Sequence, residues 1–296
     1  MARIAGQIHR LSIRYANRNP WLLGLLRLYH NKGAMIGLGI FLIICIACWV
    51  LPNIIKTDYY VFDFASSLQQ PSSEHIFGTD ILGRDMLSGV LYGGRITIRI
   101  AAAATMMAAI LGSPIGLISG YFGGRVDFVI SRFTDMLFSI PVILLTIVVE
   151  LALGWGRGNF VYAMAISASP QFTRFIRAAV LNITDRDYIK AAQVLGLSPV
   201  KIIFQHILRN VSIPLITQIT GYFSEAVLTC TILGYLGVGI NPPTPEWGVL
   251  VYSGKSYMLT HPHVILFPCL AVIVSVVSIN FFVNGLRDAL DPREDS

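Results

Sequence analysis

Long apolar stretches alternate with short polar segments along most of the chain, and this pattern predicts a bundle of membrane-spanning helices. A helix needs about 20 predominantly apolar residues to cross a bilayer. Six stretches meet this length: residues 33–51, 96–119, 128–153, 160–178, 211–236 and 265–286. The first begins only after a polar, basic segment, which is typical of a membrane anchor rather than a cleaved signal peptide. We expect an all-α polytopic membrane protein with six transmembrane helices.

The distribution of basic residues predicts the orientation of these helices. Cytoplasmic loops of membrane proteins carry an excess of Lys and Arg. Most of the 22 Lys and Arg residues lie in the N-terminal arm, between residues 174 and 209, at the helix ends on the same side, or in the C-terminal tail. An even number of spans with both termini in the cytoplasm (N-in/C-in) satisfies this bias, whereas an odd number would break it.

The same pattern divides the chain into four parts. Residues 1–32 form a cytoplasmic basic arm, in which an amphipathic helix on the membrane surface is favoured over an unstructured tail. Residues 33–94 contain the first transmembrane helix and an outer loop in which acidic residues outnumber basic ones. Residues 95–290 form a five-helix core, and residues 291–296 form a cytoplasmic tail.

A polar, basic island interrupts the core at residues 184–210 and predicts two short helices joined by a tight turn. Thr184 is placed to cap the first helix, and Gly196 supplies the turn, because glycine adopts a left-handed conformation without a Cβ penalty. Ser198 is placed to cap the second helix, with Pro199 at its first position, where a missing N–H costs nothing. On the expected topology this helix-turn-helix faces the cytoplasm and can dock to a soluble partner.

Composition agrees with a membrane protein. The chain of 296 residues is 54% hydrophobic and 13% charged, with a mean hydropathy of +0.66, whereas soluble domains carry about 25% charged residues. The net charge of +6 lies on loops facing one side, which argues against a nucleic-acid partner. Cys45, Cys48, Cys230 and Cys269 all lie in apolar stretches, so we interpret them as small buried side chains and expect no disulfide framework.

The sequence carries no motif for nucleotide hydrolysis or for enzymatic catalysis. GVLVYSGKS at residues 248–256 imitates a phosphate-binding loop, but five residues instead of four separate its two glycines. We find no Ser/His/Asp or Cys/His arrangement and no H-E-x-x-H motif. The chain is therefore expected not to be an enzyme and to hold no cofactor of its own. Asp80, Arg84 and Asp85 are expected to form local ion pairs and helix caps.

Four ionisable side chains are candidates for other roles. Glu225 lies within the fifth apolar stretch, where a carboxylate is costly and usually faces a partner or a wet cavity. A place on a polar pathway and a structural, hydrogen-bonded role are equally compatible with its position. Glu150 lies near an outer helix end, where we expect it to reach water. His261 and His263 lie in an outer loop, where exposed histidines are favoured over a metal site, because the pair makes a poor chelate.

Four separated segments resemble one family of membrane proteins. KAAQVLG at residues 190–196, followed by HIL at 206–208, resembles the cytoplasmic "EAA" loop of ABC-importer permeases. FGTDILGRDMLSGVLYGGR at residues 77–95 resembles the segment before the second span in permeases for dipeptides, oligopeptides and nickel. GVGINPPTPEWG at 237–248 and NFFVNGLRDALDP at 280–292 are similar to two further motifs of these permeases.

The resemblance covers residues 33–293 and is to the C-type permease subunits of dipeptide, oligopeptide and nickel ABC importers. The chain departs from their pattern at Lys190, Arg209 and Asn284, where Glu, Pro and Asp are usual. By resemblance, residues 184–210 form a coupling loop that docks into a groove of an ATPase subunit. The loop residues implied in docking are Ala191, Ala192, Gly196, Ser198, His206 and Leu208.

The resemblance also implies partners, a location and a mechanism. A homologous second permease forms the other half of the translocation path, and two ATP-binding subunits bring ATP and Mg. An extracytoplasmic substrate-binding protein delivers peptides or a related small solute such as nickel. The chain would be a multi-pass protein of a bacterial or archaeal plasma or inner membrane. The coupling loop would drive alternating access to a path that the fifth span, with Glu225, helps to line.

An ion-coupled secondary transporter is the alternative function. Such proteins use membrane-embedded acids and broken helices in two related halves. Glu225 is one such acid, but the sequence shows no convincing internal repeat, and the coupling loop would have no role. An intramembrane enzyme would need paired catalytic groups at one depth, and none are visible in the sequence.

Overall fold

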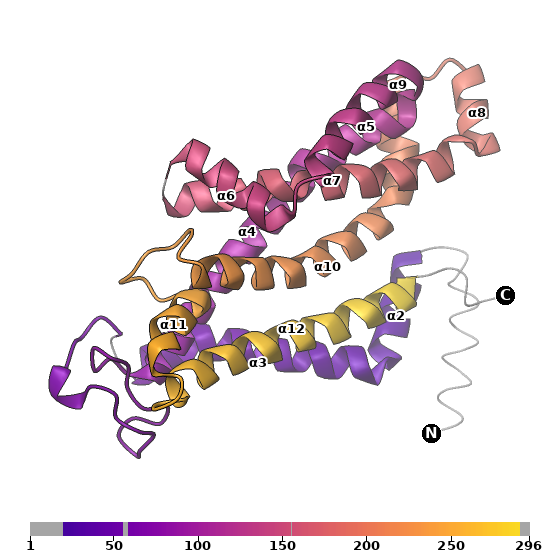
Figure 1. Ribbon diagram of the computed structural model, residues 1–296. Helices are drawn as coiled ribbons and strands as arrows, with labels where there is room; N and C mark the ends of the chain where they lie inside the picture. The colour runs from indigo at the N-terminus through magenta and orange to yellow at the C-terminus, as the bar shows by residue number, and fades with distance from the viewer. Residues whose placement is uncertain (1–19, 56–58, 155, 291–296) are drawn as a thin grey trace, which may run out of the picture.

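The computed structural model describes residues 20–55, 59–154 and 156–290, and within these ranges the chain is built of helices and their connecting loops (Figure 1). None of these residues belongs to a β-strand. The first 19 residues of the expected basic arm and the expected tail at 291–296 lie outside the described residues.

Seven long helices form the bundle, and they fall on the predicted apolar stretches. These helices are α3 (Lys32–Ile55), α4 (Met86–Phe122), α5 (Gly124–Phe138), α6 (Val142–Leu153), α7 (Arg157–Thr184), α10 (Leu208–Tyr235) and α12 (His263–Leu290). Shorter elements complete the described chain. They are α2 (Pro20–His30), η1 (Phe64–Ser66), α8 (Asp187–Val194), α9 (Pro199–Ile202), the π-helical η2 (Ile203–Ile207), α11 (Trp247–Gly254) and η3 (Lys255–Tyr257).

By length and composition, three of the described helices can cross a membrane: α3, α4 and α12. The pair α5 and α6 adds a fourth if it is counted as one bent span. Helices α7 and α10 have 28 residues each but are less apolar, since they carry Gln171, Arg174 and Glu225. Both pack inside the bundle, α7 on α4, and α10 on α4 and α12, so that neighbouring helices cover part of their surfaces.

The third apolar stretch is not the single helix that we expected. Helices α5 and α6 meet at an angle of 96°, and residues 139–141 between them are not helical. Pro141 lies directly before α6 with an extended backbone (φ −53°, ψ 133°). Proline lacks the N–H for an intrahelical hydrogen bond, and its ring excludes a helical conformation of the residue before it. The helix therefore breaks at Pro141.

Close packing of α4 against α7 forms the centre of the fold. Gly112 and Gly116 lie where these two helices approach, and a Cβ atom on Gly116 would lie 2.5 Å from the backbone oxygen of Thr173. The hydroxyl of Thr173 donates a hydrogen bond of 3.1 Å to the Gly112 oxygen. Small residues at helix contacts allow such an approach in lipid, where packing drives association. The glycines of α4 therefore allow the close contact with α7.

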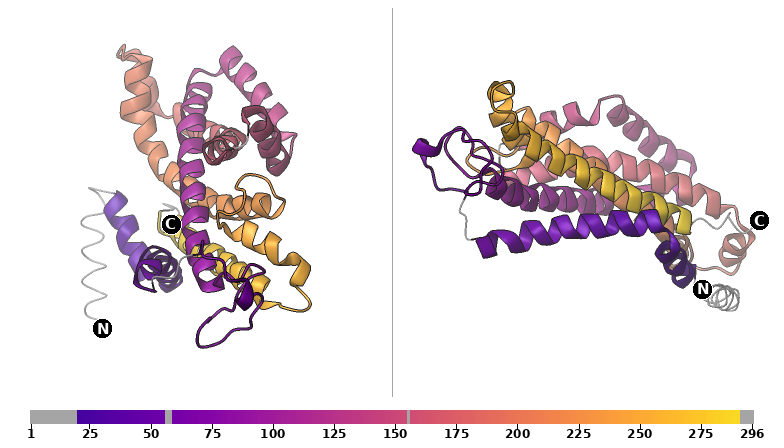
Figure 2. Two further views of the ribbon diagram at one scale, coloured as in Figure 1. Left: turned by 90° about the vertical axis from the view of Figure 1, so that its left-hand side faces the viewer. Right: turned by 90° about the horizontal axis from the view of Figure 1, so that it is seen from below.

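The described ends of the chain and the coupling loop lie at the same end of the bundle, as Figures 1 and 2 show. There α2 and the first turn of α3 pack on the last turns of α12, in a cluster of Leu28, Ala34, Leu286 and Ala289. The loop at residues 59–85 and the short helix α11 lie at the opposite end (Figure 1). This arrangement separates the structure into two polar ends joined by long helices.

Local contacts in the loop before α4 match the structural role predicted for its charged residues. Arg84 Nε donates a hydrogen bond of 2.6 Å to Asp80 Oδ2, and both side chains are buried. Asp85 caps α4 by accepting a hydrogen bond of 2.8 Å from the backbone N–H of Ser88. The four cysteines are free, two buried and two half-buried, as expected.

Candidate functional site

The coupling loop folds as two short helices around a turn, and the residues that form the turn were predicted from the sequence. Gly196 has a φ of +76°, and its N–H donates to the Gln193 oxygen at 3.0 Å, while Leu197 N–H donates to the Ala192 oxygen at 3.2 Å. These two bonds form a Schellman motif, which closes a helix end. Ser198 caps α9 by accepting from the N–H of Lys201 at 3.4 Å.

The prediction for Thr184 is wrong. This residue ends α7, and its hydroxyl donates to the Val180 oxygen at 2.8 Å. Helix α8 starts later, at Asp187, with Arg186 at its cap position. Helix α7 simply continues beyond the apolar stretch, because the hydroxyl of Thr184 can bind a carbonyl one turn earlier in the same helix.

One face of the coupling loop is anchored in the protein, and the other is exposed. Ile189, Ala192, Ile202 and Ile207 are buried in a cluster that also includes residues from α7 and α10. Among the residues implied in docking, Ala191, Gly196 and Ser198 are exposed, His206 and Leu208 are half-buried, and Ala192 is buried. Ala192 is part of the buried cluster that anchors the loop.

Four large apolar side chains of the coupling loop are exposed, and sequence reasoning missed them. We call Val194, Leu195, Val200 and Phe204 the apolar knob. Leu195 is 78% exposed. Their signal was present in the sequence, as large apolar residues inside an otherwise polar, basic segment. A firmly anchored loop that exposes such a group is typical of a protein-docking surface.

Arg177 of α7 binds Asp127 at the start of α5. Arg177 Nη2 donates to Asp127 Oδ2 at 2.6 Å, and Arg177 Nε donates to the other carboxylate oxygen. Hydroxyl groups of Ser119 and Ser131 also donate to Asp127, at 2.6 and 3.3 Å. The sequence did not indicate this pair, because its members are 50 residues apart. It joins α5 to α7 just before the coupling loop.

Glu225 lies on α10 beside a cavity of about 280 Å³. The side chain is exposed, and Glu225 Oε2 accepts a long hydrogen bond of 3.4 Å from Gln171 Nε2 on α7. The cavity is also lined by Phe138 and Pro141 at the break between α5 and α6, and by Ser167 of α7. The carboxylate thus borders an open, partly polar space next to the bent segment.

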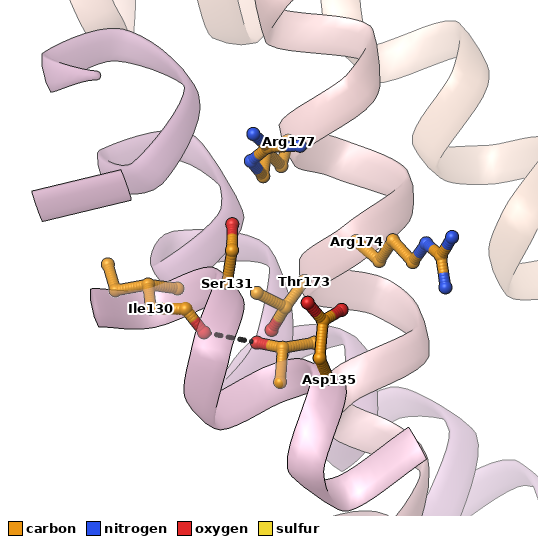
Figure 3. A pocket seen from close by; sticks show the side chains of 7 residues that line it. Ile130, Ser131, Asp135, Thr173, Arg174 and Arg177 are labelled. Carbon is orange, nitrogen blue, oxygen red and sulfur yellow. Dashed lines mark hydrogen bonds between the residues drawn. The ribbon is translucent and has the colours of Figure 1, made fainter. Parts of the chain in front are cut away.

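A second cavity of about 230 Å³ lies between α5 and α7. Figure 3 shows Ser131 and Asp135 of α5 facing Thr173 of α7, with Arg174 and Arg177 on successive turns of α7. The guanidinium carbon of Arg174 lies 5.3 Å from the ring centre of Phe138. Since Phe138 also lines the Glu225 cavity, the two cavities are neighbours on one side of α7.

Glu150 does not reach water as expected. It is fully buried on α6, and neither carboxylate oxygen has a hydrogen-bond partner among the described residues. The bend at Pro141 changes the direction of α6, which packs on α7. The side chain is consequently covered rather than directed to an outer surface.

The histidine pair lies near the opposite end from the coupling loop. His263 begins α12 and is buried, with Nε2 3.4 Å from the backbone oxygen of Thr79, while His261 is half-buried. The expectation of two exposed loop histidines is therefore wrong for His263. Within the described ranges, no group of three His, Cys, Asp or Glu side chains is placed to hold a metal ion.

Glu246 is a buried carboxylate that sequence reasoning missed. It caps α11 by accepting from the N–H groups of Gly248 and Val249 at 2.8 and 3.1 Å, and Thr97 of α4 donates to it at 2.8 Å. Burial raises the pKa of Glu246 to about 7, against the opposite effect of these hydrogen bonds. The signal was an acidic residue directly before a short apolar helix, because the N-terminus of a helix favours a negative charge. The glycine-rich segment that imitates a phosphate-binding loop is helix α11 followed by η3.

Comparisons of the sequence with protein families place these features in a known group. Residues 112–296 match the model of the binding-protein-dependent transport system inner membrane component, and residues 19–71 match the N-terminal TM domain of oligopeptide transport permease C. The two matches together cover most of the chain.

Curated relatives match over nearly their whole length. The dipeptide transport system permease protein DppC of Alkalihalophilus pseudofirmus is 36% identical over 96% of this chain and 93% of its own. The di/tripeptide transport system permease protein DppC of Pseudomonas aeruginosa is 36% identical over 89% of each chain. The glutathione transport system permease protein GsiD of Pectobacterium atrosepticum is 35% identical over 93% of this chain and 92% of its own.

A solved structure shares the fold. It is a chain from an inward-facing form of the MetNI methionine ABC transporter, with a TM-score of 0.59 and 18% identity, and the match covers 70% of this chain and 98% of that one. The matched families, the relatives and the shared fold agree with one another. The chain thus belongs to the family of binding-protein-dependent transport system inner membrane components, the permease subunits of ABC importers.

Proposed function

We propose that this permease subunit forms half of the translocation path of an ATP-driven importer of dipeptides or oligopeptides. The observation that carries the proposal is the similarity, over nearly the whole chain, to permeases named for dipeptides, di- and tripeptides and glutathione. All three cargoes are short peptides. A related small solute such as nickel is the alternative cargo of this proposal.

The proposed topology has six spans with both termini in the cytoplasm. The spans are α3, α4, the bent pair α5 and α6, α7, α10 and α12. Support comes from the position of α2, the end of α12 and the coupling loop at one end of the bundle (Figure 1). The basic residues of the coupling loop favour the cytoplasmic side for that end. The protein would lie in a bacterial inner or plasma membrane.

The coupling loop is proposed to dock to an ATP-binding subunit through the apolar knob. Burial of the knob against a partner would remove large apolar side chains from water, and burial contributes about 25 cal/mol per Å². The anchored isoleucines beneath the knob would let the loop move as one body with α7 and α10. Gly196 shapes the turn, while Ala191, Ser198, His206 and Leu208 lie around it. ATP and Mg would bind to the partner subunits.

Three kinds of partner complete the proposed assembly. A homologous second permease would close the path beside the bent pair α5 and α6, with Glu225 on the path. Two ATP-binding subunits would dock at the cytoplasmic end. An extracytoplasmic substrate-binding protein would dock at the opposite end, over the loops at residues 59–85 and 237–262.

The test is reconstitution of this chain with its co-purifying subunits in liposomes. ATP-dependent uptake of Ala-Ala, with ATP hydrolysis that rises when the binding protein and peptide are added, would support the proposal. Uptake that persists without ATP but needs a proton gradient would instead support an ion-coupled secondary transporter. The buried Glu150 and the broken α5–α6 pair are the features that such a transporter would use, so Glu150→Gln is then the first variant to measure.

A further inference from the structure

Two neighbouring cavities lie on one side of α7, and charged side chains line each of them. Glu225 borders the first cavity, and Asp135, Arg174 and Arg177 line the second. The ring of Phe138 lines the first cavity and lies 5.3 Å from the Arg174 guanidinium carbon. Phe138 therefore lies between the cavity of Glu225 and the guanidinium group of Arg174.

The first cavity has polar groups that are not used within the fold. Ser167 is only 6% exposed, and its hydroxyl has no hydrogen-bond partner among the described residues. A buried hydroxyl without a partner costs free energy, and such groups in native proteins usually bind water or a ligand. Glu225 has only the long bond of 3.4 Å from Gln171. A ligand that donates several hydrogen bonds would satisfy both side chains.

The second cavity offers a guanidinium group. Arg174 is exposed, and no ion pair in the described part of the chain includes it or Glu225. Its neighbour Arg177 is already bound to Asp127, so Arg174 is the arginine of this cavity that can bind another anion. Arginine forms strong, paired hydrogen bonds to carboxylates.

The two charged groups lie on the side of α7 that is turned away from α4. Phe172, Thr173 and Ile176 are buried, and all three meet the glycines of α4. Gln171, which contacts Glu225, and Arg174 lie three residues apart and therefore share the opposite face. They project beside the break between α5 and α6, next to the proposed path.

We propose that these two cavities bind opposite ends of a short zwitterionic peptide, with Glu225 and Ser167 at its ammonium group and Arg174 at its carboxylate. This inference rests on the proposed function and names how the path would recognise its cargo. Glu225 is on α10 and meets α7 at Gln171, which lies three residues before Arg174, a rise of about 4.5 Å along the helix. A dipeptide spans at most about 7 Å, which is enough to reach from the Glu225 contact to Arg174. Ser167 lies four residues before Gln171, on the side away from Arg174.

The experiment measures peptide binding to the purified assembly of this chain with its partner permease and ATPase subunits, without the external binding protein. The probes are Ala-Ala, N-acetyl-Ala-Ala and Ala-Ala amide, which differ only in terminal charge. Dissociation constants are measured by saturation-transfer NMR. We expect each capped probe to bind the wild type about tenfold more weakly, the loss typical of one charged hydrogen-bonding group.

Two variants assign the ends of the peptide. Glu225→Gln should bind Ala-Ala and N-acetyl-Ala-Ala equally while still preferring Ala-Ala to its amide. Arg174→Gln should bind Ala-Ala and Ala-Ala amide equally while still preferring Ala-Ala to N-acetyl-Ala-Ala. Arg132→Gln is the matched control, because Arg132 is an exposed arginine on α5 that lies 5.2 Å from the Phe128 ring and lines neither cavity. Arg132→Gln should still prefer Ala-Ala both to N-acetyl-Ala-Ala and to Ala-Ala amide.

ATP hydrolysis and Ala-Ala uptake by the same preparation separate this inference from the proposed function. An assembly that imports Ala-Ala but binds the capped probes equally well, or whose variants keep both wild-type preferences, would overturn the inference alone. The same holds if the wild type imports Ala-Ala yet binds no probe at millimolar concentration. An assembly without ATP-driven uptake would overturn the proposed function as well.

Discussion

Arg177 of α7 binds both carboxylate oxygens of Asp127 of α5, and this pair joins the bent segment to the helix that leads into the coupling loop. Movement of α7 would therefore be passed to α5, which lines both cavities. Two-point hydrogen bonding between arginine and a carboxylate fixes the direction as well as the distance of the contact.

Asp127→Asn should weaken the contact between α5 and α7. The loss of a partly exposed, charged hydrogen-bonded pair costs about 1–2 kcal/mol, so the thermal midpoint of the detergent-purified assembly should fall. Asp185→Asn is the control, because Asp185 forms a fully exposed pair with Lys190 at 3.8 Å. If the thermal midpoint fell as far in Asp185→Asn as in Asp127→Asn, this result would contradict the importance of the Arg177–Asp127 pair.

Gly196→Val should impair coupling without preventing membrane insertion. A left-handed backbone costs a residue with a Cβ atom about 1–2 kcal/mol, and the turn of the coupling loop would change shape. The measurement is the ratio of peptide uptake to ATP hydrolysis, which we expect to fall. Gly158→Val is the control, since both glycines have open space around the added Cβ but only Gly196 has a positive φ. Normal coupling in Gly196→Val would argue against a docking role of the turn.

Leu195→Asp should reduce binding of the ATPase subunits. A charge on the apolar knob would have to lose its hydration when the partner covers it, which is unfavourable without a compensating charge. We expect less ATPase to co-purify, with an unchanged thermal midpoint of this chain because Leu195 is exposed. Gln205→Asp adds the same charge at an exposed polar position of the same loop and should have a smaller effect. If both variants lost the same amount of co-purifying ATPase, the added charge alone would explain the loss, and the apolar knob would not be needed for docking.

Glu246 should make stability depend on pH. Its pKa in the folded protein is raised from the ordinary value of 4.5 to about 7, so the protonated carboxyl is favoured on folding. The stabilisation is complete below pH 4.5 and is lost as pH rises through 7, by about 3 kcal/mol at most. Thermal midpoints between pH 5 and 8 test this dependence. Glu246→Gln cannot titrate, so its thermal midpoint should not show this pH dependence. If the variant had the same pH profile as the wild type, Glu246 would be excluded as the source of the pH dependence.

The contacts that were predicted correctly from the sequence join residues that lie close together in the chain. The Gly196 turn, the Ser198 cap and the Asp80–Arg84 pair each involve residues fewer than six positions apart. Such contacts depend on helix periodicity and on the residues that favour turns and caps. Residue types and their spacing were therefore sufficient to predict these contacts. The error at Thr184 also has a local cause, since a threonine can either cap a helix or bond within one.

By itself, the sequence determined that this protein is a helical membrane protein with a polar coupling loop, because apolar length and loop charge follow directly from residue order. Only the tertiary structure decided that Glu150 is buried, that Asp127 meets Arg177 and that Thr97 meets Glu246 across 149 residues. It also decided that Phe138 lies between the charges of Glu225 and Arg174. These contacts depend on how helices distant in the chain pack together, and on the direction that α6 takes after Pro141, which periodicity within one helix does not specify.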